Sequence, residues 1–385
     1  MIDLAPLIGP PDELGVYIAF RVFPKKGRER WLLELRYWRP WHLETWPRAN
    51  LRAHGIYAAA RFLGFAGIHL PFRRVTLSVA RGSAYDEFRQ SFDKLSVFLG
   101  TPGLNQKFVV FAKKGKKAWF IKVPISVRSI ALAKTEAAAL SALSQDDDLA
   151  PLVPQFFWIG KNLAIEDVRL TGGAYAPLDI FEMSRVHDLL FSRSWTEDTI
   201  EDIATGWANP GPVPHPDQET RTLIDKARDA AYAHISGFEK KTLVQCYLAH
   251  GDFTRWNVLR SKDGSARIID WELYGKRPKF FDPFHYIVSQ AILVDQANAR
   301  EILERIFQFG SSVADRSSVL LYFSLYLIEQ VLTYCDLYER GSDTSPQVHW
   351  QLRKWKDLFD LLSSDPMDSQ AAGKSYPCVL TKSVP

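Results

Sequence analysis

The most constraining feature of the sequence is a block of polar side chains set between short apolar runs at residues 249–272. It reads Ala-His-Gly-Asp-Phe-Thr-Arg-Trp-Asn-Val-Leu over residues 249–259, and resumes after a turn as Ala-Arg-Ile-Ile-Asp-Trp-Glu over residues 266–272. Two apolar runs joined by a Lys-Asp-Gly-Ser turn at residues 262–265 predict a β-hairpin. Such a hairpin would place Asn257 beside Asp270, with Asp252 in the loop that leads into it.

Composition limits the class of protein to a globular one with a large core. The chain has 385 residues, of which 46% are hydrophobic and 24% charged. These values exclude a disordered, collagen-like or polytopic membrane protein, and the length favours two or three domains. Three cysteines in no CxxC spacing provide neither a disulfide framework nor a zinc signature, so a reducing compartment is expected.

The N-terminal residues argue against export. Acidic residues and prolines stand where a signal peptide would carry positive charge and an apolar core. The most membrane-like stretch, residues 55–72, is short and contains Arg61, which is costly at the centre of a bilayer. We therefore expect a cytoplasmic protein without a transmembrane helix.

Residues 1–92 form a basic, tryptophan-bearing segment that we expect to be an N-terminal extension. Residues 1–74 hold 12 Lys/Arg against 6 Asp/Glu, and a helix is predicted over residues 47–65, where Arg48, Arg52 and Arg61 alternate with apolar residues. Three interpretations stay open. The helix packs its apolar face on the next domain, or it contacts an anionic membrane surface as a peripheral element, or it binds nucleic acid. Nucleic acid is disfavoured because no helix-turn-helix, RRM or zinc-finger pattern is present.

The rest of the chain divides into a strand-rich part, a helical part and a tail. Alternation and turn residues predict five strands and one helix over residues 93–170. Residues 171–363 are mostly helical, and residues 364–385 form a flexible tail. The predicted strands span residues 95–99, 107–112, 118–123, 155–159 and 162–168, with a helix at 129–143; the later helices span residues 179–192, 196–206, 217–239, 297–308, 315–339 and 345–363.

The polar block carries the groups that phosphoryl transfer from ATP requires. A carboxylate must orient the acceptor hydroxyl and accept its proton, and oxygen ligands must hold Mg²⁺ against the nucleotide phosphates. Asp252 suits the first role. Asn257 and Asp270, flanking the hairpin, suit the second.

The joint pattern H-G-D-x-x-x-x-N followed by I-D-W-E resembles the aminoglycoside phosphotransferase and choline-kinase-like family. The resemblance implies an α+β, two-lobed protein-kinase-like fold, with a small β-rich N-lobe and a mostly helical C-lobe, and ATP and Mg²⁺ as cofactors. It makes Asp252 the catalytic base and His250 a brace of the loop. It makes Asn257 and Asp270 the metal ligands, and Glu272 a position of less defined role.

The upstream residues supply candidates for the nucleotide site. Lys122 ends an apolar strand as the family's phosphate-binding lysine does, and Glu136, fourteen residues later in the helix, is its candidate partner. A solvated strand-end lysine and an exposed helix glutamate are the structural alternatives. Both Lys122 and Asp270 must reach one nucleotide, so we expect them within about 10 Å of each other.

Further candidates follow from the resemblance. Gly100 and Gly103 stand where a phosphate-covering loop belongs, although Gly-Thr-Pro-Gly is not GxGxxG. Glu166 and Val168 resemble the hinge that meets adenine through backbone groups. Asp282 resembles an aspartate that anchors the catalytic loop.

The acceptor is less defined than the reaction. We expect an ATP-dependent kinase that transfers phosphate to an alcohol group of a small molecule, saccharide or lipid-type acceptor. A lipid-linked or interfacial acceptor would explain the basic extension. The alternatives are a catalytically silent kinase-fold binding or scaffold protein and an aminoglycoside-type antibiotic kinase.

Overall fold

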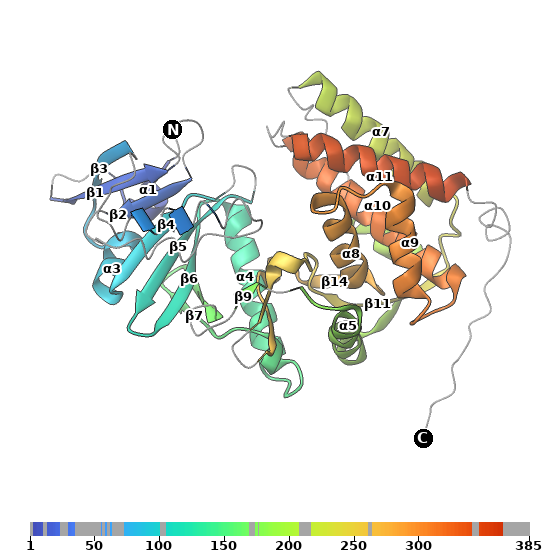
Figure 1. Cartoon of the computed structure of the whole chain (residues 1–385), viewed down its shortest axis with the longest axis horizontal. Coiled ribbons are helices and arrows are strands. Elements are labelled where there is room, and N and C mark those ends of the chain that lie inside the picture. The colour runs from blue at the N-terminus through green and yellow to red at the C-terminus, as the bar shows by residue number, and fades with distance from the viewer. Residues whose placement is uncertain are drawn as a thin grey trace. The chain divides into compact units, whose positions relative to one another are not determined.

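The chain forms two compact units, one rich in strands and one mostly helical (Figure 1). Unit 1 comprises Met1–Pro177 and Trp256–Leu273, and unit 2 comprises Leu178–Arg255 and Tyr274–Pro385. This architecture confirms the predicted α+β fold with a β-rich part followed by a helical part. The computed structural model describes residues 3–10, 14–23, 30–34, 55, 58–59, 62–63, 73–100, 105–168, 174–175, 177–207, 217–260, 264–340 and 346–364.

Unit 1 is built on an eight-stranded sheet with the strand order β3-β1-β2-β4-β5-β6-β8-β7. The five strands predicted from the sequence are the last five in that order. Neighbouring strands among these five pair antiparallel. The strands are β1 Val16–Phe23, β2 Trp31–Glu34, β3 Arg73–Val79, β4 Lys94–Phe98, β5 Lys107–Lys114, β6 Lys117–Pro124, β7 Phe156–Ile159 and β8 Asn162–Glu166.

The described strands of the N-terminal segment continue this sheet. Strand β2 pairs with β4, and β1 and β3 follow outward. Glu34 at the end of β2 is buried, where it accepts hydrogen bonds from Tyr85 Oη at 2.9 Å and from Arg89 Nη2 at 3.0 Å, both on helix α3 (Ala84–Ser91). Most of the helix predicted over residues 47–65 lies outside the described residues, and residues 55, 58–59 and 62–63 within it are helical.

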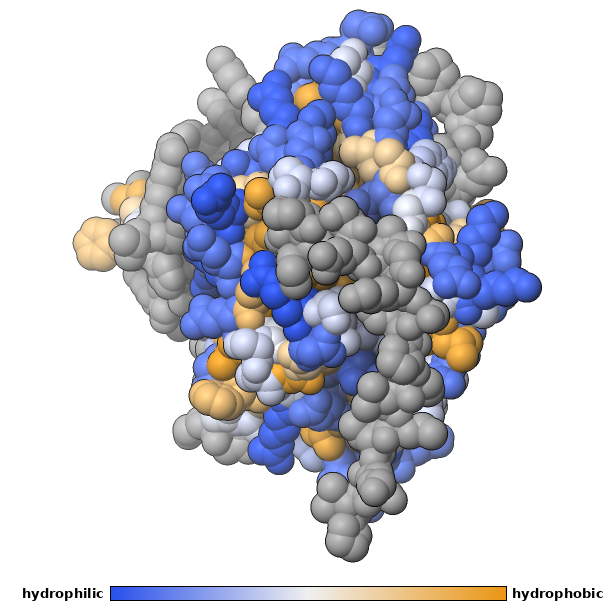
Figure 2. Space-filling view, turned by 90° about the vertical axis from the view of Figure 1, so that its right-hand side faces the viewer, coloured by the Kyte–Doolittle hydropathy of each residue, from blue (hydrophilic) through white to orange (hydrophobic). Residues whose placement is uncertain are grey.

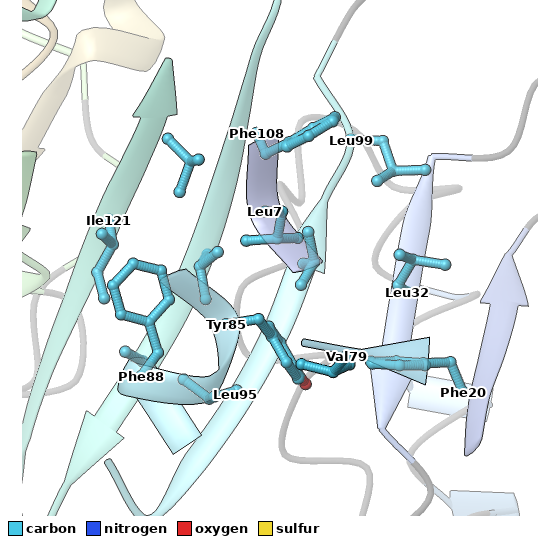
Figure 3. Close-up of a cluster of buried hydrophobic side chains, with 14 of the residues drawn as sticks. Leu7, Phe20, Leu32, Val79, Tyr85, Phe88, Leu95, Leu99, Phe108 and Ile121 are labelled. Carbon is cyan, nitrogen blue, oxygen red and sulfur yellow. The ribbon is translucent and has the colours of Figure 1, made fainter. Parts of the chain in front are cut away.

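One apolar core joins the N-terminal strands to the predicted N-lobe strands (Figure 3). Phe20 and Leu32 come from β1 and β2, Phe108 and Ile121 from β5 and β6, and Phe88 from α3, and all are buried. Each such side chain contributes roughly 1.5–3 kcal/mol when removed from water. The N-terminal strands and the β5–β6 hairpin therefore pack into the same hydrophobic core. Helix α1 (Ala5–Ile8) contributes Leu7 to this core.

The remainder of unit 1 carries the second half of the polar block, residues 256–272. Helix α4 (Val127–Leu143) begins with a capping box between Ser126 and Ser129. The predicted hairpin is present as β12 (Val258–Arg260) and β13 (Ala266–Ile268), and β12 also pairs with β9 (Ala174–Tyr175). The described residues also form short 3₁₀ helices: η2 Ala150–Leu152, η4 Arg255–Asn257, which spans the boundary with unit 2, and η5 Trp271–Leu273.

Unit 2 packs seven helices, counted over its described residues, with a three-stranded sheet of order β10-β11-β14. Five of the six helices predicted beyond residue 170 are present within a few residues. The elements are α5 Ile180–Ser194, β10 Thr196–Thr199, α6 Ile200–Thr205, α7 Gln218–Ile235, β11 Leu243–Ala249, β14 Gly275–Pro278, α8 Phe281–Leu293, α9 Ala299–Gly310, α10 Arg316–Arg340 and α11 Pro346–Ser364.

Two predictions in unit 2 were wrong. The helix expected over residues 196–206 begins as strand β10, because Thr196–Thr199 pairs antiparallel with β11 and this tertiary pairing overrides local preference. Helix α8 was missed, since the sequence led us to expect strands and loops up to residue 283. Ten of the thirteen residues of α8 are buried, and Pro283, a residue that usually marks a break, lies in its first turn, where proline is tolerated.

One described helix is long and apolar enough to cross a membrane by length and composition, Arg316–Glu339 within α10. Of its most apolar window, 72% is buried inside the structure, and α10 packs against α7, α8, α9 and α11. It therefore behaves as the core helix of unit 2. The face shown in Figure 2 is largely hydrophilic among the described residues, with apolar side chains in small scattered groups.

Candidate active site

Unit 1 contains a buried ion pair between Lys122 and Glu136. Strand β6 presents Lys122 toward helix α4, where Nζ donates to Glu136 Oε2 at 2.5 Å. Both side chains are buried, and Glu136 is fully so. Burial opposes the charge of Lys122, but the carboxylates of Asp270, Glu136 and Glu272 outweigh it and raise the pKa of this lysine above its ordinary value. The alternatives of a solvated lysine and an exposed glutamate are excluded.

Asp270 also contacts Lys122, as the sequence motif predicts. Lys122 Nζ also contacts Asp270 Oδ1, although 148 residues separate the two in the chain. This contact confirms the expectation that Lys122 and Asp270 lie within about 10 Å of each other. Glu272 lies 3.7 Å from Lys122 Nζ and contacts Lys107 Nζ, which is itself 3.8 Å from Asp270.

Lys107 is a member of this cluster that the sequence analysis missed. It begins strand β5, whose residue Val109 lies directly opposite Lys122 in the β5–β6 register. Side chains two residues apart on a strand share a face, so Lys107 stands diagonally beside Lys122 on that face. Alternation along the predicted strand places Lys107 and Val109 on one face. Only the register of the hairpin shows that Lys122 lies on the same face.

The β12–β13 hairpin places Asp270. Val258 pairs with Ile268 in this hairpin. The N–H of Ile269, the residue before Asp270, donates to the carbonyl of Asn257 at 2.9 Å. The backbones of Asn257 and Ile269 are therefore neighbours. Asp270 adopts a positive φ of 69°, a conformation uncommon outside glycine in which Asp and Asn are enriched. The orientation of the Asp270 side chain therefore depends on a backbone conformation that few residue types adopt.

The donor set of this cluster fits a hard divalent cation. Glu136, Asp270 and Glu272 each offer a carboxylate oxygen, and these oxygens lie within 4.8 Å of one another. Mg²⁺ prefers such oxygen ligands. Burial raises the pKa of Glu136 above its ordinary value while the Lys122 ammonium opposes the shift. The three carboxylates outnumber the two lysines, which leaves net negative charge for a cation.

The loop that carries Asp252 belongs to unit 2, where Asp282 anchors it. Asp282 Oδ2 accepts the backbone N–H of His250 at 2.7 Å, and Oδ1 accepts that of Gly251 at 3.0 Å. His250 is fully buried, and its Nδ1 accepts the N–H of Asp252 at 3.2 Å. Asp282 and His250 therefore hold the loop in the manner expected of an anchor and a brace.

His285 on helix α8 is a second residue that the sequence analysis missed. Its Nε2 lies 3.1 Å from Asp252 Oδ1. The side chain of Asp252 remains partly exposed while the imidazole is buried. No spacing within the polar block indicated this contact, because it depends on how α8 packs beside the loop.

The remaining site residues stay predictions for nucleotide contact. Gly100 adopts a φ of 74°, and a Cβ there would lie 2.3 Å from the carbonyl oxygen of Lys107, so this position requires glycine. Gly103 lies outside the described residues. Glu166 ends β8, where its N–H donates to the carbonyl of Gln155, and Val168 follows as a buried residue.

Comparisons with known proteins found similar solved structures. No protein-family model and no curated protein matches the sequence. Solved structures of small-molecule kinases are similar to this chain. Choline kinase LicA from Streptococcus pneumoniae matches at 16% identity and a TM-score of 0.46, covering 72% of this chain and 97% of LicA. The microcompartment-associated aminopropanol kinase matches at 14% identity and a TM-score of 0.42, covering 74% of this chain and 97% of that kinase.

A spectinomycin phosphotransferase, APH(9)-Ia, solved with ADP and spectinomycin, matches at 16% identity and a TM-score of 0.41, covering 71% of this chain and 94% of that enzyme.

Proposed function

We propose that this chain is an ATP-dependent phosphotransferase that transfers the γ-phosphate to an alcohol group of a small-molecule, saccharide or lipid-type acceptor. The observation that carries the proposal is the buried Lys122–Glu136 pair in contact with Asp270. A buried ion pair is costly to build and is weak evidence of stability, so a functional reason for it is favoured. Lysine paired with a helix glutamate and facing a metal-binding aspartate is the arrangement that phosphoryl transfer in kinases requires.

The proposed chemistry assigns one role to each group. The acceptor oxygen forms a bond to the γ-phosphorus, the bond from that phosphorus to the β,γ-bridging oxygen breaks, and ADP leaves with the bridging oxygen. The acceptor hydroxyl proton passes to the carboxylate of Asp252 and then to solvent. Lys122 binds phosphate oxygens, and Glu136 orients Lys122.

The carboxylate donors support Mg²⁺ as a cofactor. Asp270 and Asn257 would hold the ion, and Glu272 offers a further oxygen. When bound, Mg²⁺ supplies positive charge that offsets the charge of the phosphates. Gly100, Gly103, Glu166 and Val168 are proposed to contact the nucleotide through their backbones.

Two variants test the assignment with Mg²⁺-ATP. We expect Asp252→Ala to abolish phosphate transfer while leaving nucleotide binding nearly intact, and Asp270→Ala to lose Mg²⁺-dependent binding as well. Binding is measured by thermal shift and transfer by ADP release. Asp360→Ala serves as the control, because Asp360 is an exposed residue on α11 that pairs with Lys356 one turn away on the same helix. Near-normal transfer by Asp252→Ala would show that the base is misassigned.

A panel of hydroxyl compounds identifies the acceptor. It includes choline, aminopropanol, spectinomycin, hexoses and a lipid-linked saccharide. Release of ADP that depends on one compound defines the acceptor and separates a metabolic kinase from an antibiotic kinase. If the protein binds Mg²⁺-ATP tightly but releases no ADP with water or with any compound of the panel, the catalytically silent alternative is favoured.

A further inference from the structure

The imidazole of His285 lies between a carboxylate on one side and a phenol on the other. Its Nε2 is 3.1 Å from Asp252 Oδ1, and its Nδ1 is 3.3 Å from the hydroxyl of Tyr326 on helix α10. The ring stacks on Phe281 with an interplanar angle of 15°. His285 and Tyr326 are both buried, so the ring has a defined place and orientation.

We propose that His285 is a positioning residue for Asp252 and that Tyr326 sets its tautomer. The inference rests on the proposed function, in which Asp252 is the base. A neutral imidazole has one N–H donor and one acceptor nitrogen, and an ionised carboxylate only accepts hydrogen bonds. Nε2 must therefore carry the proton that is donated to Asp252. Nδ1 is then the acceptor, and the hydroxyl of Tyr326 donates to it.

The Tyr326 hydroxyl can supply the proton that this direction of donation needs. Burial raises the pKa of the Tyr326 phenol well above its ordinary value, and the charges of Tyr334 and Asp252 add to the shift. The hydroxyl thus keeps its proton near neutral pH and can donate it to Nδ1. The same arrangement, a second group that sets the tautomer of a histidine whose other nitrogen contacts the functional group, is common in protein sites.

The contact has a mechanistic consequence because a base must first be in the right place. A carboxylate on a loop samples several rotamers, and one hydrogen bond from a buried ring restricts them. Misplacing a reacting group by about 1 Å costs on the order of 100-fold in rate. His285 thus contributes to turnover through Asp252, while nucleotide binding in unit 1 does not depend on it.

The tautomer is measured directly by long-range ¹H–¹⁵N NMR on the full chain labelled with ¹⁵N-histidine. The variant His285→Gln identifies the His285 signals among the nine histidines. We expect the Nε2–H tautomer in the wild type, and a shift toward a mixture of tautomers in Tyr326→Phe. A wild-type ring protonated at Nδ1 or at both nitrogens, or unchanged signals in Tyr326→Phe, overturns the proposal. This readout does not require turnover, so it is independent of the proposed function.

Kinetics then separate positioning from folding. The probe is ADP release from Mg²⁺-ATP, with water as acceptor and with any panel compound that the wild type phosphorylates. We expect His285→Ala to lower kcat about 100-fold while the KM for ATP stays within about twofold. His285→Gln should recover most of the rate, because its side-chain amide also donates a hydrogen bond toward Asp252.

A matched histidine serves as the control. His234 Nε2 lies 3.0 Å from Ser324 Oγ, also on α10, so His234→Ala removes a comparable part-buried histidine contact to that helix and should leave kcat unchanged. Thermal unfolding of each variant checks that it is folded. Full kcat in His285→Ala, or equal losses in the Gln and Ala variants of His285, overturns the positioning role. Absence of turnover in the wild type would instead count against the proposed function.

Discussion

Replacing Lys122 by methionine tests the electrostatics of the site in the folded protein. Methionine matches the aliphatic stem of lysine, so the change removes the charge with little loss of packing. It leaves Glu136 fully buried beside the carboxylates of Asp270 and Glu272. Removing one partner of a buried ion pair costs about 3–5 kcal/mol, because the other charge is left without compensation.

Protonation of Glu136 limits this cost and makes it depend on pH. Burial already raises the pKa of Glu136 above its ordinary value of 4.5, and loss of Lys122 removes the charge that opposes the shift. A carboxyl group with a raised pKa in the folded state stabilises the fold most below pH 4.5, and this stability is lost as pH rises through the folded-state pKa. At 1.36 kcal/mol per pH unit, protonating the group costs about 3.4 kcal/mol at pH 7 and about 0.7 kcal/mol at pH 5.

We therefore expect Lys122→Met to lose about 3 kcal/mol of unfolding free energy at pH 7 and under about 1 kcal/mol at pH 5. The double variant Lys122→Met with Glu136→Gln should regain most of the loss at pH 7, since no buried carboxylate remains at position 136. The assay is urea unfolding followed by tryptophan fluorescence. Lys117→Met, at the exposed start of the same strand, is the control.

Two results would refute this reasoning. One is an equal loss of stability at pH 7 and pH 5, which would mean that packing and not charge explains the effect. The other is a double variant as unstable as Lys122→Met, which would show that Glu136 is not the group left without compensation. In either case the buried pair would not have the electrostatic role assigned to it.

Three further outcomes are expected. Asp282→Asn places an N–H donor against a backbone N–H of residue 250 or 251 and should cost about 1–3 kcal/mol and most of the phosphate transfer, measured by thermal unfolding and ADP release; unchanged values would contradict the anchoring role. Gly100→Ala should lower stability by about 1–3 kcal/mol in thermal unfolding, because a Cβ meets a backbone carbonyl at a positive φ, and a variant as stable as the wild type would disprove that requirement. Changing Arg48, Arg52 and Arg61 together to Gln should weaken co-sedimentation with anionic liposomes at low salt, since each basic residue near such a surface contributes about 1 kcal/mol; equal binding by both proteins, or none by either, would rule out the proposed peripheral location at a membrane.

The sequence alone determined the strand-rich and helical parts and the neighbourhood of the main polar residues. Period-two alternation and turn residues predicted strands β4 to β8, and the short β12–β13 turn predicted that Asn257 and Asp270 approach each other. These features are local, because a strand pattern or a tight turn is specified within a few residues. The contact of Lys122 with Asp270 is long-range, and its prediction came from the family motif.

The side chains that complete the site are brought together by tertiary packing. Lys107 joins Glu272 through the strand register, and His285 reaches Asp252 because α8 packs against the loop. The same is true of Glu34, whose burial against α3 joins the N-terminal strands to the larger sheet. Each contact links segments far apart in the chain, and its formation depends on how sheets and helices bury their apolar faces together. Local preference carries no information about that packing.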